Sequence, residues 1–331
     1  MARAGAPANN GPRLSFGSAS PWYQGWPLTL SLTCGIQPEQ SWGVTLDQIT
    51  KTNYINRMVA ENPVDQNSVE KRHTTSKRLL MAIEADVKLT TGEIQTHGEE
   101  HLKEIPPNKK VIIATTHISD LDVPIATLKL GKYFDIAITN QSIHHSFLGE
   151  PSTNIGMRIA GRENFIPIDT KKIEGKKHGE FNPQNFEPMR DALERGKAII
   201  IAAHNPTQKW KLSKGGYGAA YLTAISENVV ILPVVVNIES DEPLGMAETI
   251  LKDVVKRPDA SVYIQEPIEL EKINGIEDFE KILGKRKRGE KLTKEERLRF
   301  SELKTVLEKR SDQIMQALAS DLPEKKRGEY L

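Results

Sequence analysis

The chain has 331 residues, a formal net charge of +1 and one cysteine, Cys34. A single cysteine excludes an intrachain disulfide, and the balanced charge gives no indication of a nucleic-acid partner. The longest apolar run, residues 229–236, is much shorter than the roughly 20 residues that cross a bilayer. We therefore expect a cytoplasmic protein, either soluble or peripheral on the inner face of a membrane.

The N-terminal 38 residues contain no acidic residue and are rich in Ala, Gly, Asn, Ser and Pro. This composition cannot build a core and predicts an irregular arm, which we extend over residues 1–70. Organellar transit peptides share the lack of acids, so targeting to an organelle is the alternative. The aromatic cluster at 21–27 either packs on the protein or touches a membrane interface.

Residues 75–89 carry apolar side chains at three- and four-residue spacing, which predicts a helix capped by Thr75 or Ser76. Residues 93–98 are expected to form a short edge strand. Several histidines lack the spacing to Cys, Asp or Glu that a metal site requires, and we assign them to the surface: His97, His101, His144 and His145.

From residue 105 onward, short apolar strands alternate with helices. We expect a helix between the first two strands and further helices over 186–194 and 217–226, with Gly196 ending the earlier of these. The expected strands are 111–114, 134–139, 165–168, 198–203, 229–236 and 262–265. This alternation is typical of an α/β fold with a mainly parallel, mixed sheet covered by helices, and we assign it residues 71–283.

Residues 284–331 are expected to form a helical extension that packs on this domain. The basic run at 284–291 predicts a solvated loop, with binding of anionic lipid headgroups as the functional alternative. Thr293 and Glu296 have the spacing of a capping box. An apolar stripe then marks the face of a helix that packs on the core: Leu303, Val306, Leu307, Ile314, Met315 and Leu318.

Polar residues follow the predicted strand 111–114, where an α/β protein has its ligand crevice. Among them are His117 and, five positions later, Asp122. A carboxylate bound to one imidazole nitrogen leaves the other nitrogen to accept a proton from an attacking hydroxyl. The alternative is structural, because this spacing occurs by chance and Ser119 and Asp120 are ordinary N-cap residues.

Together with later segments, this block resembles the glycerophospholipid acyltransferase family, whose members esterify glycerol-3-phosphate and lysophosphatidic acid. The first block of the family is a His and an Asp with four residues between them, as in His117 and Asp122; Thr116 stands where Asn is common. Other stretches are similar to the family's lead-in, second block, fourth block and a bacterial tail: 98–102, 161–169, 230–235 and 322–330.

Two blocks depart from the family pattern. The second block has Thr170 where an arginine is often found. The third block should read Pro-Glu-Gly-Thr-Arg-Ser, and this chain has Ala203-His-Asn-Pro-Thr-Gln208, so that His204 stands at the position of the glutamate. Both arginines that the family places near the phosphate of the acceptor are therefore missing.

The resemblance implies transfer of a fatty acyl chain from acyl-CoA or acyl-carrier protein to a hydroxyl of a glycerol phosphate, a lysophospholipid or a related acceptor. His117 would be the general base, and Asp122, rather than Asp120, its orienting partner. The acceptor itself is the nucleophile, so no acyl-enzyme, metal or tightly held cofactor is implied. Backbone amides near the motif, or a donor from the third block, would stabilise the oxyanion.

Fixed positive charge suits the phosphate of such an acceptor. The candidates for substrate binding are Ser119, Arg162, His204, Lys211, Lys214 and Gly215. Other bases lie close in sequence, and such loop bases are commonly only solvated: Arg158, Lys171, Lys172 and Lys209.

Three other classes of protein share some of these features. A decayed relative would keep the fold as a lipid- or acyl-binding module; retention of His117 and Asp122 argues against decay, and the altered third block argues for it. A serine hydrolase lacks its Gly-x-Ser-x-Gly elbow here. The glycines of 213–218 match neither the Walker spacing nor the dinucleotide fingerprint.

Overall fold

The chain divides into two units, Met1–Asp65 and Gln66–Leu331, and every described residue belongs to the second. The predicted arm, its aromatic cluster, His144 and His145 lie outside the described residues, and the domain bounds given above stay predictions. The computed structural model describes residues 74–119, 121–140, 161–168, 182–204, 211–239 and 257–331.

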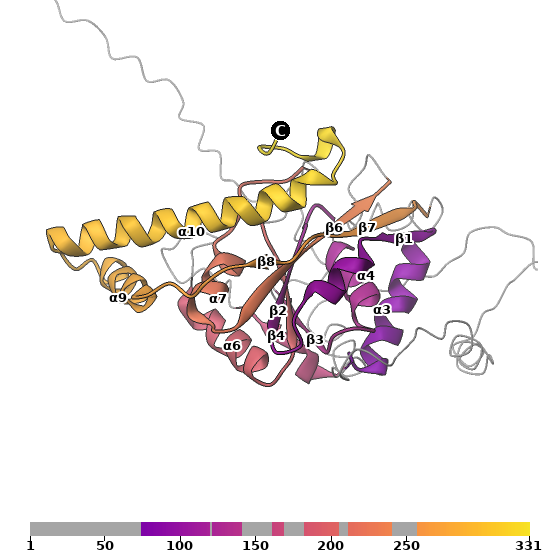
Figure 1. Ribbon diagram of the computed structural model, residues 1–331, viewed down its shortest axis with the longest axis horizontal. Coiled ribbons are helices and arrows are strands. Elements are labelled where there is room, and N and C mark those ends of the chain that lie inside the picture. Colours follow the sequence, from indigo (N-terminus) through magenta and orange to yellow (C-terminus); the bar gives the residue numbers. More distant parts are fainter. Residues whose placement is uncertain (1–73, 120, 141–160, 169–181, 205–210, 240–256) are drawn as a thin grey trace, which may run out of the picture. The chain divides into compact units, whose positions relative to one another are not determined.

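The described strands form one eight-stranded sheet in the order β1-β7-β6-β2-β5-β3-β4, with β8 paired to β6 (Figure 1). All pairs are parallel except those of β6 with β7 and with β8. The mainly parallel, mixed sheet is thus confirmed, as is the edge position of β1. The strands are β1 Ile94–His97, β2 Lys110–Thr115, β3 Ile136–Asn140, β4 Phe165–Pro167, β5 Ala198–Ala202, β6 Val229–Ile238, β7 Ala260–Ile264 and β8 Ile268–Glu269.

Helices cover both faces of the sheet, with α3 and α4 on one side and α6, α7 and α9 on the other (Figure 1). Side chains of β2 alternate between the two cores, so Ile113 packs with the α3–α4 side and Ile112 with the other. The α-helices are α3 Lys77–Thr90, α4 Asp122–Leu130, α6 Glu187–Glu194, α7 Gly218–Ile225, α9 Ile276–Lys287 and α10 Lys294–Ser320. Short 3₁₀ helices are Glu99–Glu104, Arg162–Asn164, Pro183–Phe186 and Glu324–Lys326.

The start of α3 differs from the expectation. Ser76 is the N-cap residue, but its side chain makes no capping hydrogen bond. The Thr75 hydroxyl donates to the Phe134 carbonyl at 2.6 Å and accepts from the Ile136 amide at 2.9 Å. Thr75 therefore ties the start of the helix to the beginning of β3, and its one hydroxyl, engaged by Phe134 and Ile136, does not cap α3.

The basic run is a loop, as predicted, only in its second half. Its first half, up to Lys287, forms the last turn of α9. Ile276, Phe279 and Ile282 give this helix a buried face, and bases at its carboxyl end are favourable for the helix dipole.

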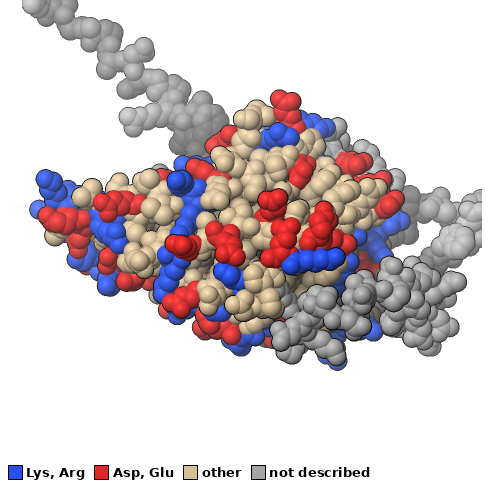
Figure 2. Space-filling model, in the orientation of Figure 1, with Lys and Arg blue, Asp and Glu red and all other residues tan. Residues whose placement is uncertain are grey.

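The charges of this run are interleaved with acids. Lys285 pairs with Glu296 and Arg288 with Glu290, each at 2.5 Å. On the face drawn in Figure 2, basic and acidic side chains accordingly alternate at the end formed by α9 and α10. That face carries no continuous basic patch around α9.

The predicted capping box of α10 is confirmed, since the Thr293 hydroxyl accepts from the Glu296 amide at 3.1 Å and Glu296 reaches back to the Thr293 amide. The predicted stripe is buried in the core with one exception, Val306, which is 40% exposed. Val306 lies one position before Leu307 and so turns away from the packed face. Among the described helices, none combines the length and the apolar character needed to cross a membrane.

Candidate functional site

The candidate site lies where β2 and β5 end. The two strands are parallel neighbours, with Thr115 paired to Ala202. The segments that follow them therefore leave the sheet at the same edge. The Ala203 amide donates to the Thr115 carbonyl at 2.9 Å and continues the pairing by one residue. The first and third sequence blocks are therefore adjacent in space.

His204 joins the two blocks directly. Its Nε2 accepts a hydrogen bond of 3.0 Å from the backbone amide of His117, 87 positions earlier. Its Nδ1 lies 3.2 Å from the Ser213 hydroxyl, and the residue is buried. Because an accepting Nε2 carries no proton, these contacts assign His204 as a neutral ring with the proton on Nδ1.

Asp122 holds the turn that carries His117. It is the fully buried first residue of α4, and its Oδ2 accepts from the amides of Ile118 at 2.8 Å and Ser119 at 3.3 Å. Its Oδ1 is buried as well. The contacts of Asp122 thus fix the backbone of the turn, and its role in orienting the His117 ring stays a prediction.

Burial raises the pKa of Asp122 to about 7. The backbone amides of Ile118 and Ser119, the Thr116 hydroxyl and the charge of Lys326 lower it only in part. Desolvation disfavours a buried carboxylate, and two amide donors are not enough to restore its usual acidity. The carboxyl group therefore changes its charge close to neutral pH.

The amides of this turn are already used within the protein. The His117 amide donates to His204, while those of Ile118 and Ser119 donate to Asp122. None of the three can stabilise an oxyanion without giving up its present acceptor. The other expected source of a donor, the third block, falls mostly on residues 205–210, outside the described chain.

The other candidates occupy different positions. Ser119 is buried, and its hydroxyl accepts from the Leu121 amide at 3.1 Å. Lys211 and Lys214 are exposed, and Lys214 lies 3.9 Å from Glu308. Gly215 packs against α10.

Arg162 begins a 3₁₀ helix before β4. The loop bases Arg158, Lys171, Lys172 and Lys209 lie outside the described residues. The structure therefore brings together His117, Ser119, Asp122 and His204, and a β-bridge with His204 adds Gly215.

Ser213 and Lys326 lie near the site but are not among the residues that the sequence predicts for it. Lys326 is buried and its ammonium donates to the Asn237 side chain at 2.9 Å and to the Ile238 carbonyl at 2.5 Å, at the end of β6. The one available signal was the tail block at 322–330, which resembles a family segment but offers no role for its residues.

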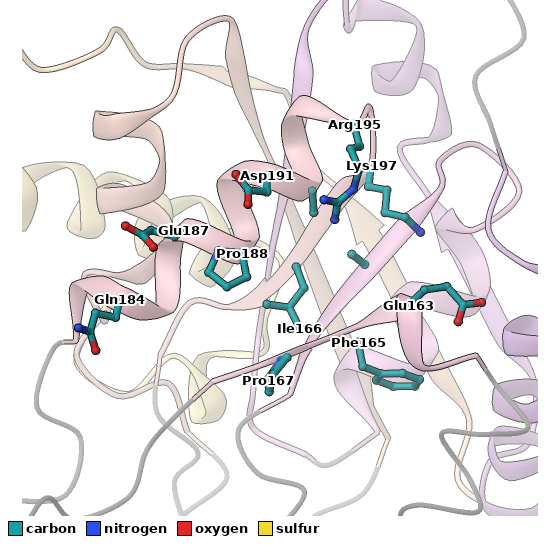
Figure 3. A pocket seen from close by; sticks show the side chains of 12 residues that line it. Glu163, Phe165, Ile166, Pro167, Gln184, Glu187, Pro188, Asp191, Arg195 and Lys197 are labelled. Carbon is teal, nitrogen blue, oxygen red and sulfur yellow. The ribbon is translucent and has the colours of Figure 1, made fainter.

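A cavity of about 550 Å³ lies elsewhere, between α6 and the strands β3 and β4 (Figure 3). It has an apolar part at Phe165, Ile166 and Pro167 and charged groups such as Glu163 and Arg195 around it. None of the described lining residues is a candidate from the sequence. In the part of the chain that the structure describes, no three His, Cys, Asp or Glu side chains gather as a metal site would need.

No family model matches the sequence, and no curated protein matches it. Among solved structures, the chain is similar to the crystal structure of PlsC, the 1-acyl-sn-glycerophosphate (LPA) acyltransferase from Thermotoga maritima. The match has 14% identity and a TM-score of 0.39, and it covers 64% of this chain and 77% of that one.

Proposed function

We propose that the protein is an O-acyltransferase that moves a fatty acyl chain from acyl-CoA or acyl-carrier protein to a hydroxyl of a glycerol phosphate, a lysophospholipid or a related acceptor. The observation that carries the proposal is the turn after β2. There His117 stands at the ligand-binding edge of a parallel sheet, and the Asp122 carboxyl is buried against the backbone of the same turn.

In the proposed reaction His117 accepts the proton of the acceptor hydroxyl as its oxygen attacks the thioester carbonyl. The tetrahedral intermediate then collapses, the carbon–sulfur bond breaks, and the imidazolium returns the proton to the departing sulfur. Because Nδ1 of His117 is buried, the nitrogen that meets the hydroxyl in this proposal is Nε2. Such acid–base help contributes about 10²- to 10⁴-fold in rate.

The acceptor would bind through residues around this turn and after β5. Arg162, Lys211 and Lys214 are the candidates for its phosphate, and Ser119 and Gly215 stay candidates for substrate contact. The acceptor need not be glycerol-3-phosphate, because both family arginines are absent. Contact with a membrane surface would bring the protein to a lipid acceptor.

A lipid- or acyl-binding module is the second candidate, and one observation favours it. His204, at the position of the family's glutamate, already has both ring nitrogens in contacts within the protein, with the His117 amide and the Ser213 hydroxyl. An imidazole with both nitrogens in such contacts holds the site together and would have to give up a contact to bind a substrate.

The test is acyl transfer from a labelled acyl thioester to a panel of hydroxyl acceptors by the wild type, His117→Ala and His101→Ala. His101 is a matched control because its side chain makes a local hydrogen bond with Glu104, three positions away. Transfer that vanishes only in His117→Ala supports the enzyme, and the best acceptor identifies the substrate class. No transfer to any acceptor, with binding of the thioester or lipid retained, would favour the binding module.

A further inference from the structure

The C-terminal tail, residues 322–331, contacts the segment 211–216 that carries the partner of His204. We infer that Tyr330 in this tail and His204 are positioning residues, which hold the His117 turn through a chain of hydrogen bonds that spans the site. The inference rests on the proposed function for its effect on catalysis. The hydrogen-bonded chain itself is independent of it.

The tail holds the segment on both sides of Ser213. Before it, the Leu212 amide donates to the Lys326 carbonyl at 2.9 Å. After it, the Gly215 amide donates to the Tyr330 hydroxyl at 3.0 Å, across 115 positions of sequence. Ser213 lies between these two fixed points, so its hydroxyl is held where it meets His204.

Close packing leaves the tail little freedom. Gly328 has a φ of +62°, and a Cβ at this position would lie 2.0 Å from the Leu212 carbonyl oxygen. Lys326 anchors the tail at the end of β6. The Arg327 side chain donates to the Leu322 and Ser320 carbonyls, which fixes the bend after α10.

Helix α10 holds the same segment from another direction. The Ser311 hydroxyl donates to the Gly216 carbonyl at 3.0 Å. A Cβ on Gly215 would lie 2.4 Å from that hydroxyl oxygen and 2.6 Å from Met315, so only glycine permits this approach. The Gly216 amide in turn donates to the Ala203 carbonyl at 2.8 Å, beside His204.

His204 connects this segment to the turn that carries His117. It forms a β-bridge with Gly215, contacts Ser213 through Nδ1 and accepts the His117 amide at Nε2. Loss of the Tyr330 hydroxyl should therefore loosen segment 211–216 and, through His204, the backbone of His117. A general base displaced by a fraction of an ångström loses rate, while remote binding of substrate is unaffected.

Two pairs of variants test the inference. Tyr330→Phe removes the acceptor of the Gly215 amide, and Tyr133→Phe is its control, because that hydroxyl donates to Glu99 away from the site. His204→Gln places an amide oxygen near the position of Nε2, whereas the shorter His204→Asn reaches only the position of Nδ1. Each variant is measured for kcat, KM and hydrogen exchange at the His117 amide.

We expect kcat to fall roughly tenfold in Tyr330→Phe and further in His204→Asn, with KM within about twofold. His204→Gln should retain most of kcat and the protection of the His117 amide, and Tyr133→Phe should match the wild type. Unchanged protection of that amide in Tyr330→Phe, or equal losses in the Gln and Asn variants, would overturn the inference. Absence of acyl transfer in the wild type would refute the proposed function. Hydrogen exchange at the His117 amide would still test whether Tyr330 and His204 position the turn.

Discussion

The two polar regions at the edge of the sheet are held in opposite ways. Most of the turn 117–122 is fixed by its own residues, since Asp122 accepts from Ile118 and Ser119 and the Leu121 amide donates to Ser119. Its first amide, that of His117, is held from outside the turn by His204. The segment 211–216 is held by α10 and the tail, about 100 positions later in the chain. A local motif can thus encode the first region, whereas only the completed fold can build the second.

The largest effect on stability is expected from Asp122, the buried carboxyl group of the local turn. The pKa of Asp122 is raised from 3.8 to about 7, so the folded protein binds more protons than the unfolded chain between these values. The contribution of Asp122 to stability should therefore be greatest at low pH and fall as pH rises through this window. The contribution of Asp122 to this fall is about 4 kcal/mol.

Asp122→Asn keeps an oxygen for the two amides and removes the ionisation. The free energy of unfolding, measured with denaturant from pH 4 to 8, should lose this component of its pH dependence, so that the variant gains on the wild type as pH rises. A parallel pH profile for the two proteins would show that the carboxyl group is not desolvated as described.

The second effect on stability is expected in α10, the helix that holds the segment 211–216. Leu307 is fully buried, and Leu307→Ala should destabilise the protein by roughly 2–5 kcal/mol because a cavity is left. Val306→Ala, one position away on the exposed face, should cost less than about 0.5 kcal/mol. Equal costs by thermal or chemical unfolding would contradict the orientation of α10.

The smallest effect on stability is expected where Gly328 of the tail contacts the Leu212 backbone. Gly328→Ala should cost roughly 2 kcal/mol, because its Cβ would meet the Leu212 backbone in a left-handed conformation. Gly196→Ala has a similar φ of +82° with nothing within 4 Å of the new Cβ, so it should cost only about 1 kcal/mol. Indistinguishable unfolding free energies would remove the evidence for tight packing of the tail.

The sequence predicted the sheet well because its strands are short apolar runs between turn signals. It failed at α9, where the cluster of bases obscured an apolar face formed by Ile276, Phe279 and Ile282. It also placed Val306 in the core, since regular spacing over a long helix does not define the width of the buried face.

Spacing alone predicts only the local half of the candidate site, and His204 and Gly215 became candidates through their places in and after the third block of the family resemblance. His117 and Asp122 are close in sequence, and their spacing marks them. The contacts of His204 with the His117 amide, of Tyr330 with Gly215 and of Lys326 with the end of β6 join residues about 85 or more positions apart. No periodicity or spacing in one sequence encodes such pairs.

The proposed reaction depends most on His117 as the general base for acyl transfer. Its most direct test is the single-turnover rate of transfer to the best acceptor, compared between the wild type, His117→Ala and His101→Ala, with folding of each verified by circular dichroism. We predict a rate about 10²- to 10⁴-fold lower in His117→Ala and unchanged in His101→Ala. A His117→Ala rate within about threefold of the wild type would contradict the account.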